Sequence, residues 1–252
     1  MRFAVLGSGS RGNGLLVAAD GTRVLIDCGF SAAETERRLA RLGCAPEDLE
    51  AIVLTHEHAD HARGACMLAR RWGLPLLGSP GTLASLADTE GVGLRPFDIH
   101  VPFALGALRF EPFPVPHDAR EPCQLVVTDG DRRLALVTDA GHVTPHMARL
   151  LGGAHALLLE CNHDPGLLAE GPYPPTLKAR VGGPYGHLSN AQAAALAAEV
   201  AWAGLRHVVA MHLSEQNNTP GHARAALAAA LGCGPEELAC AGQDEPLPWM
   251  RV

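Results

Sequence analysis

Short runs of apolar residues, bounded by glycine, proline or charged residues, recur along the whole chain. Runs of this length and spacing predict strands. We expect strands at residues 3–6, 15–18, 24–26, 52–54, 99–101, 108–113, 125–128, 134–137, 156–159 and 207–211, with a further strand around Leu76.

Longer apolar or alanine-rich segments predict helices between these strands. The segments are residues 32–42, 62–72, 145–151, 190–203 and 222–231. Thr219 suits the N-cap of the last helix, and Pro220 suits its first position. Many strands with intervening helices imply sheets that are covered by helices, so the predicted fold class is α/β, a layered sandwich.

Length and composition indicate one globular unit. With 252 residues and 26.4 kDa the chain can form one substantial core, and no linker divides it, so we expect a single domain over residues 1–252. No apolar run approaches the about 20 residues that span a membrane. The run at residues 3–6 is also too short for a signal peptide. We therefore expect no membrane partner and a cytoplasmic location.

The cysteines and the net charge narrow the chemistry. The seven cysteines include no CxxC pair, which favours reduced thiols over disulfides or a zinc ribbon. The net charge of -7 gives no overall attraction to nucleic acid. A metal site would still add local positive charge.

The segment Thr55-His56-Glu57-His58-Ala59-Asp60-His61 carries the strongest chemical signal. Imidazole and carboxylate ligands suit zinc, manganese or iron. The segment lies between a predicted strand and a predicted helix, so His56 and His58 can point to one side while Asp60 and His61 point to another. That arrangement suits two adjacent ions. A histidine-rich surface loop is the alternative, and the zincin motif fits poorly because its histidines lie four apart on one helix.

Other predicted strands also end in a polar residue. Asp27, His117, Asp139 and His212 each follow an apolar run. Such strand ends are where α/β sheets bind ligands. A single aspartate at a strand end is more often a turn residue, but together with the histidine segment these four become candidates.

This ordered set resembles the metallo-β-lactamase superfamily in its two-metal form. The resemblance implies a four-layer αββα sandwich, with one ion on His56, His58 and His117 and the other on Asp60, His61 and His212. It also implies that Asp139 bridges the ions and that Asp27 orients the histidine segment from behind. Two ions about 3.5–4 Å apart can bind a bridging hydroxide as nucleophile and stabilise an in-line displacement at phosphorus.

Two later segments favour a phosphodiester substrate. Glu160 ends an apolar run, and His187 precedes a predicted helix. The pair resembles the glutamate and histidine of phosphodiesterases such as tRNase Z. A carboxylate beside an imidazole raises its pKa and fixes its tautomer, so His187 is the candidate general acid and Glu160 its partner. Asp60 is also a candidate catalytic residue. A loop histidine beside a helix cap is the alternative for His187.

The closer resemblance is to the YycJ (WalJ) family. It rests on six segments: Gly7-Ser8-Gly9-Ser10-Arg11-Gly12-Asn13, Leu25-Ile26-Asp27-Cys28-Gly29, Glu160-Cys161-Asn162-His163-Asp164, Gly171-Pro172-Tyr173-Pro174, Gly186-His187-Leu188-Ser189-Asn190 and His212-Leu213-Ser214-Glu215-Gln216-Asn217-Asn218. The resemblance implies a 5′-to-3′ DNA exonuclease associated with mismatch repair. The interval between Asp139 and His187 has no room for the domain that RNA-processing β-CASP nucleases carry, so DNA is expected more than RNA.

Further residues are candidates for contacts with the substrate. They are Ser10 and Asn13 in the first glycine-rich loop, Asn162 and His163 after Glu160, and Lys178 and Arg180 before His187. The first loop lacks the Gly-Lys-Ser/Thr ending of a Walker motif, so no nucleotide cofactor is expected. A hydrolase of small esters, of glyoxalase II or lactonase type, and a non-catalytic scaffold are the alternative functions.

Overall fold

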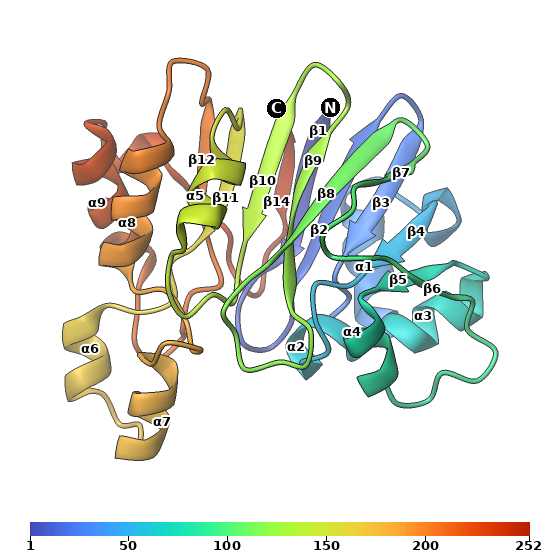
Figure 1. Cartoon of the computed structure of the whole chain (residues 1–252), viewed down its shortest axis with the longest axis horizontal. Coiled ribbons are helices and arrows are strands. Elements are labelled where there is room, and N and C mark those ends of the chain that lie inside the picture. Colours follow the sequence, from blue (N-terminus) through green and yellow to red (C-terminus); the bar gives the residue numbers. More distant parts are fainter.

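The computed structural model describes residues 1–252 and contains two seven-stranded sheets (Figure 1). Sheet A has the order β14-β1-β2-β3-β4-β5-β6. Its strands are β1 (Arg2–Gly7), β2 (Gly14–Ala19), β3 (Thr22–Ile26), β4 (Ala51–Val53), β5 (Leu76–Gly78), β6 (Leu94–Pro96) and β14 (Leu247–Arg251). The strands from β3 to β6 are parallel, whereas β14, β1, β2 and β3 pair antiparallel.

Sheet B has the order β13-β12-β11-β10-β9-β8-β7. Its strands are β7 (Phe103–Leu105), β8 (Leu108–Pro114), β9 (Cys123–Thr128), β10 (Arg133–Val137), β11 (Ala156–Glu160), β12 (His207–Met211) and β13 (Ala239–Cys240). Here β10 to β13 are parallel and β7 to β10 are antiparallel. Each sheet therefore has a parallel half whose strands all end at one edge.

Helices cover the outer face of each sheet. They are α1 (Ala32–Arg41), α2 (Ala59–Ala62), α3 (Ala65–Trp72), α4 (Pro80–Ser85), α5 (Pro145–Leu151), α6 (Pro165–Glu170), α7 (Pro175–Val181), α8 (Asn190–Val200) and α9 (Pro220–Leu231), with short 3₁₀ turns at Pro46–Asp48 and Pro235–Glu237. In Figure 1, α1 and α3 lie outside sheet A, and α5, α8 and α9 lie outside sheet B. The lobe formed by α6 and α7 projects from the lower edge of the sandwich, the edge at which α2 also lies.

Three buried clusters hold these layers together. A central cluster of 24 residues joins the inner faces of the two sheets, and includes Phe3 and Phe110. A second cluster packs sheet B against its helices, and a third packs sheet A against α1 and α3. Strand β11 is buried along its whole length because its side chains serve two of these clusters. The predicted α/β sandwich, with layers in the order αββα, is confirmed.

Two predicted elements differ from the structure. Residues 99–101 form a turn, not a strand, because the Asp98 side chain accepts a hydrogen bond from the N–H of His100 and its carbonyl accepts one from Val101. The predicted helix 62–72 corresponds to α3, which begins only at Ala65, because α2 ends at Ala62 and the chain is not helical at Gly64. A side chain at Gly64 would collide with the carbonyl of Phe30, so the chain needs glycine where the histidine segment meets α3.

Helix ends and short elements account for the other differences. Helix α8 ends at Val200, and α9 begins at Pro220, with Thr219 as its N-cap as expected. The helices α4, α6 and α7 and the strands β6, β7, β13 and β14 were not predicted from the apolar pattern. All are short, and α7 contains no buried residue, so a core-facing pattern is absent. No helix has both the length and the apolar character that a membrane crossing requires.

Candidate metal centre

The candidate ligands converge from separate strand ends of both sheets. In sheet A, Asp27 follows β3 and the segment from His56 to His61 follows β4, while in sheet B His117 follows β8 and Asp139, Glu160 and His212 lie at the ends of β10, β11 and β12. The parallel halves of the two sheets end at the same edge of the sandwich, which places polar residues far apart in sequence beside one another.

Asp27 fixes the shape of the histidine segment. Its carboxylate accepts hydrogen bonds from the N–H of Thr55, at 2.9 Å, and from the hydroxyl of Thr55, at 2.9 and 3.1 Å. One oxygen also lies 2.7 Å from Nδ1 of His61. This contact leaves Nε2 of His61 directed at the site, so Asp27 sets both the position and the tautomer of a candidate ligand.

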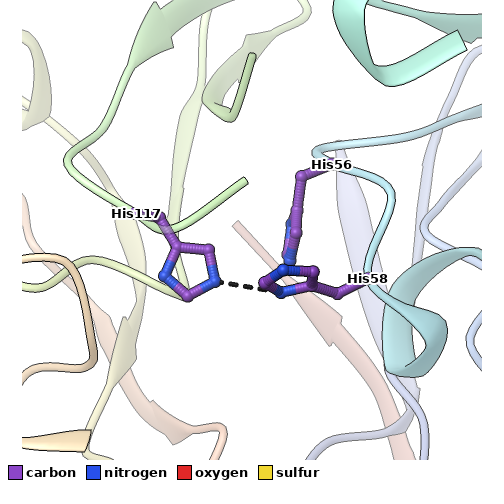
Figure 2. Close-up of side chains that lie close together, drawn as sticks. All are labelled: His56, His58 and His117. Carbon is purple, nitrogen blue, oxygen red and sulfur yellow. Dashed lines mark hydrogen bonds between the residues drawn. The ribbon is translucent and has the colours of Figure 1, made fainter. Parts of the chain in front are cut away.

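Four overlapping groups of side chains have ligand atoms within 4.8 Å of one another. The groups are His56, His58 and His117; His56, His61 and Asp139; Asp60, His61 and His212; and Asp139, Glu160, His187 and His212. The structure thus brings together every residue of the two predicted triads. Figure 2 shows the three rings of the first group turned toward a common point, with Nε2 of His117 3.2 Å from Nδ1 of His58.

Asp139 lies between the two triads. Its Oδ2 is 3.0 Å from Nε2 of His61, and its Oδ1 is 3.8 Å from Nε2 of His117 and 3.4 Å from Nδ1 of His212. Asp60 completes the second triad from α2, with Oδ2 3.2 Å from Nε2 of His212. This is the central position that the sequence predicts for a bridging carboxylate.

The donor set fits divalent metal ions. Nε2 of His56 is buried and has no hydrogen-bond partner. A buried polar atom without a partner costs free energy, so a missing partner is expected at this nitrogen. Imidazole nitrogen and carboxylate oxygen together suit zinc, manganese or iron. The cluster is therefore suited to binding metal ions.

Backbone strain is concentrated at the same site. Asp27, Asp139 and His212 have φ values of 60°, 54° and 54°, in the left-handed region that residues other than glycine rarely adopt. Only Asp20 and Asp88 share this property elsewhere among the non-glycine residues. The surrounding strands hold the three site residues in a costly conformation that aims their side chains at the centre.

The carboxylates raise the pKa of two candidate ligands. Burial alone would lower the pKa of His212, but Asp139 and Asp60 raise it to about 10. Burial also opposes charge on His61, yet Asp139 and Asp27 raise its pKa well above the usual value. These imidazoles must lose their protons to bind metal, so a divalent cation would replace the protons in balancing the carboxylates.

Glu160 and His187 form a second functional pair beside Asp139. Nδ1 of His187 lies 2.8 Å from Oε1 of Glu160 and 3.4 Å from Oδ1 of Asp139. Glu160 is fully buried, and its Oε2 accepts the N–H groups of Ala140 and Leu188 at 3.0 Å. Burial opposes the charge of Glu160, but His187 lowers its pKa to about 2.

The first glycine-rich loop supports the second triad from behind. Nδ2 of Asn13 lies 3.2 Å from the backbone oxygen of Asp60 and 3.1 Å from Nε2 of His61. Its Oδ1 accepts the hydroxyl of Ser8, and the same hydroxyl accepts the N–H of His212 at 2.8 Å. The loop therefore connects ligands that come from different sheets.

A cavity of about 260 Å³ opens over these groups. It is lined by Ser10, His58, Asp60, His117, Asp118, Asp139, Tyr173, Leu177, Arg180, Val181, Gly186, His187 and His212. A larger cavity of about 510 Å³ is lined by residues from both chain ends and by no candidate ligand. Both chain ends lie at the upper edge of the sandwich in Figure 1. The smaller cavity is the one that gives access to the candidate metal centre.

The predicted substrate contacts divide into two groups. Ser10 and Arg180 line the cavity. Asn13, Asn162, His163 and Lys178 do not line it, and their contact with the substrate stays a prediction. The first three are buried, and Asn162 donates to the carbonyl of His212. Lys178 points to the carbonyl of Ala169.

Several residues at the site were not predicted from the sequence. Thr55 and Asp118 each adjoin a predicted ligand, and that adjacency was the available signal. The carboxylate of Asp118 forms an ion pair with Arg180, with its Oδ2 2.6 Å from Nε of Arg180. Ser8 and Tyr173 gave no such signal, because their roles depend on the tertiary packing of a loop and of the α6–α7 lobe.

Fold and site together define the class of metallo-β-lactamase-fold hydrolases, which are metal-dependent enzymes. Residues 22–213 match the Beta-lactamase superfamily domain. By that match and by the relatives described next, the chain belongs to the beta-lactamase superfamily and, within it, to the family of YycJ and WalJ.

Exodeoxyribonuclease YycJ of Bacillus anthracis is 35% identical over 237 residues, covering 92% of this chain and 89% of that protein. Exodeoxyribonuclease WalJ of Streptococcus pneumoniae is 32% identical over 223 residues, covering 86% and 83%. Among solved structures, the metallo-beta-lactamase fold protein YhfI of Bacillus subtilis has a TM-score of 0.75 at 18% identity, covering 97% and 98% of the two chains. That last likeness supports the fold.

Proposed function

We propose that this protein is a nuclease that needs two divalent metal ions and degrades DNA from its 5′ end, with a role in mismatch repair. The observation that carries the proposal is the contact between Glu160 and His187 beside Asp139. An imidazole held at this point can serve a reaction whose leaving group needs a proton. The similarity to two exodeoxyribonucleases over most of the chain supports DNA as the substrate.

The two triads are assigned as the ligands of the ions, with Asp139 between them. Two zinc, manganese or iron ions, when bound, supply positive charge that polarises a phosphodiester and activates water. Asp27 and Asn13 keep the ligands in position through the contacts described above. The protein's part is to fix the ligand geometry before the substrate arrives.

His187 is assigned as the general acid. Its Nδ1 is occupied by Glu160, so Nε2 is the nitrogen that remains for the substrate in the cavity. Donation of a proton from Nε2 to the leaving oxygen completes cleavage, and Glu160 stabilises the imidazolium that precedes it. General acid catalysis of this kind contributes about 10²–10⁴-fold to a rate.

Arg180 and Ser10 are assigned to the substrate phosphates. Both line the cavity, and Arg180 is held there by its ion pair with Asp118. A guanidinium can form two hydrogen bonds to a phosphate, which fixes orientation as well as charge. Arg180 thus places a positive charge beside the candidate metal ligands, although the chain as a whole is acidic.

The test is a substrate panel. Protein loaded with Mn²⁺ or Zn²⁺ is incubated with end-labelled single- and double-stranded DNA, with RNA of the same sequence, and with a thioester. The expected result is stepwise release of nucleotides from 5′-phosphorylated DNA, with slower or no release from RNA. Rapid thioester hydrolysis without nucleotide release would instead identify a small-ester hydrolase. No hydrolysis by a protein with two bound ions would favour a scaffold.

A further inference from the structure

Part of the lining of the cavity belongs to the α6–α7 lobe. The lining combines the carboxylates and imidazoles of the candidate site with residues of the lobe, which are Tyr173, Leu177, Val181 and the cation Arg180. A nucleotide likewise combines a charged phosphate with an apolar planar base.

The lobe contributes little to the cores of the fold. Helix α7 contains no buried residue, and neither Leu177 nor Val181 belongs to any of the three buried clusters. The polar contacts of the helix include the ion pair between Arg180 and Asp118 and the hydrogen bond from Lys178 to the carbonyl of Ala169. Apolar side chains that do not pack into a core, but line a cavity, are available to contact a ligand.

Tyr173 stands out by its side-chain type. The chain has only two tyrosines, and Tyr173 is the one aromatic side chain other than histidine that lines this cavity. The other, Tyr185, lies in the same part of the chain but is 60% exposed and does not line the cavity. Aromatic rings bind single-stranded nucleic acid by stacking on bases, without regard to sequence.

The size of the cavity limits what the ring can meet. A volume of about 260 Å³ is near the lower end of small-molecule sites, which run to roughly 300–1,000 Å³. A space of this size can hold a single nucleotide, and an unpaired end offers one.

We infer that Tyr173, with Leu177 and Val181, forms the subsite for the base of the terminal nucleotide. This rests on the proposed function, which supplies the phosphodiester at the candidate ligands. The subsite orients an unpaired end so that its first linkage meets the candidate ligands. Tyr173 determines specificity for an end that carries a base, and it takes no part in the chemical step.

The test measures binding apart from cleavage. A 5′-phosphorylated single strand with a 3′ fluorophore is titrated, by anisotropy, with Mn²⁺-loaded protein that carries His187→Ala to prevent degradation. The same measurement is made after adding Tyr173→Ala, Tyr173→Phe or Tyr185→Ala. A strand whose first residue is abasic is compared in each case. Native mass spectrometry of each tyrosine variant counts the bound Mn²⁺ ions and shows whether the metal centre is retained.

We expect Tyr173→Ala to raise the Kd about tenfold, within the range of base stacking. Tyr173→Phe and Tyr185→Ala should each change the Kd less than twofold. Protein that retains Tyr173 should bind the abasic strand about tenfold more weakly than the strand with its first base. For the abasic strand, Tyr173→Ala should not raise the Kd further. An unchanged Kd in Tyr173→Ala, or a tenfold rise in Tyr185→Ala instead, would overturn the inference. Degradation of the strand at the wild-type rate in the His187→Ala background would contradict the proposed role of His187 and is seen separately on a gel.

Discussion

Oε1 of Glu160 lies within hydrogen-bond distance of two imidazoles, 2.8 Å from Nδ1 of His187 and 3.1 Å from Nδ1 of His212. One buried carboxylate thus connects the candidate general acid with a candidate metal ligand. This single side chain, at the end of β11, fixes the relative position of the groups proposed for metal binding and for proton donation.

Replacement of His187 separates these two functions. His187→Ala should keep two metal ions per chain and reduce DNA degradation by about 10²–10⁴-fold, because the leaving oxygen loses its proton donor. Hydrolysis of bis(p-nitrophenyl) phosphate should change little, since its leaving group does not need a proton. Metal content and both rates are measured on one preparation. A metal-loaded variant that degrades DNA at the wild-type rate would show that His187 is not the acid.

Asp27 should control metal affinity without touching the cavity. Asp27→Asn removes the charged acceptor of Nδ1 of His61, and loss of such a partner costs about 10–100-fold in metal affinity. Asp20→Asn is the matched control, because Asp20 also has a positive φ but lies in an exposed turn. Affinity is measured by competition with a chromogenic chelator. Equal affinity in the two variants would refute the role of Asp27.

Asn13 should matter for one ion more than the other. It contacts Asp60 and His61 but no member of the triad formed by His56, His58 and His117. In Asn13→Ala, native mass spectrometry at limiting metal should show a shift from two ions per chain toward one. Ser10→Ala, in the same loop but exposed, should keep two. Equal loss of both ions from Asn13→Ala would mean that the loop supports the whole site.

Glu34 should make the stability of the fold depend on pH. Its hydrogen bond from Arg37 lowers its pKa to about 2, and it also pairs at 2.5 Å with Nε of Arg38, which is buried. Arg38 in turn donates to the carbonyl of Leu6 at the end of β1. The depressed pKa stabilises the fold fully above about pH 4.5, and this contribution is lost as the pH falls toward 2.

Glu34→Gln should therefore lower the free energy of unfolding at pH 7 by about 1–2 kcal/mol, less than for a fully buried pair because Glu34 is partly exposed. The difference from the wild type should shrink toward zero near pH 2. Glu50→Gln, at an exposed residue without an ion pair, should change little at any pH. Urea denaturation at several pH values measures all three proteins. A difference that does not depend on pH would exclude the ion pair as its source.

Much of the site could be predicted because its residues stand at strand ends. A strand such as β10 ends in a run of apolar residues, and Asp139, two residues after its end, is visible in the sequence. The layered α/β sandwich followed from the same runs, and the order αββα followed from the family resemblance. The prediction failed where local polar bonding decided the structure, as at Asp98, whose side chain turns the chain at residues 99–101. It also failed for α7, which has no buried face and so no apolar period.

Side-chain direction could not be predicted from a motif. Asn13 and Asn162 were expected to meet the substrate, yet their amides face inward and hold Asp60, His61 and His212 in place. Tyr173 lies in one of the six segments that carry the family resemblance, but no contact was predicted for it, and the folded lobe brings it to the cavity. Motifs identify which residues gather at an edge, but packing decides which of them face the substrate.

We propose that the protein degrades DNA when two metal ions are bound at this site. The most direct test titrates metal-free protein with Mn²⁺, counts bound ions by native mass spectrometry, and measures nucleotide release from 5′-phosphorylated DNA at each step. We expect nucleotide release to appear as the second ion binds and to reach its maximum at two ions per chain. Full release at one ion per chain, or none at two, would contradict this proposal.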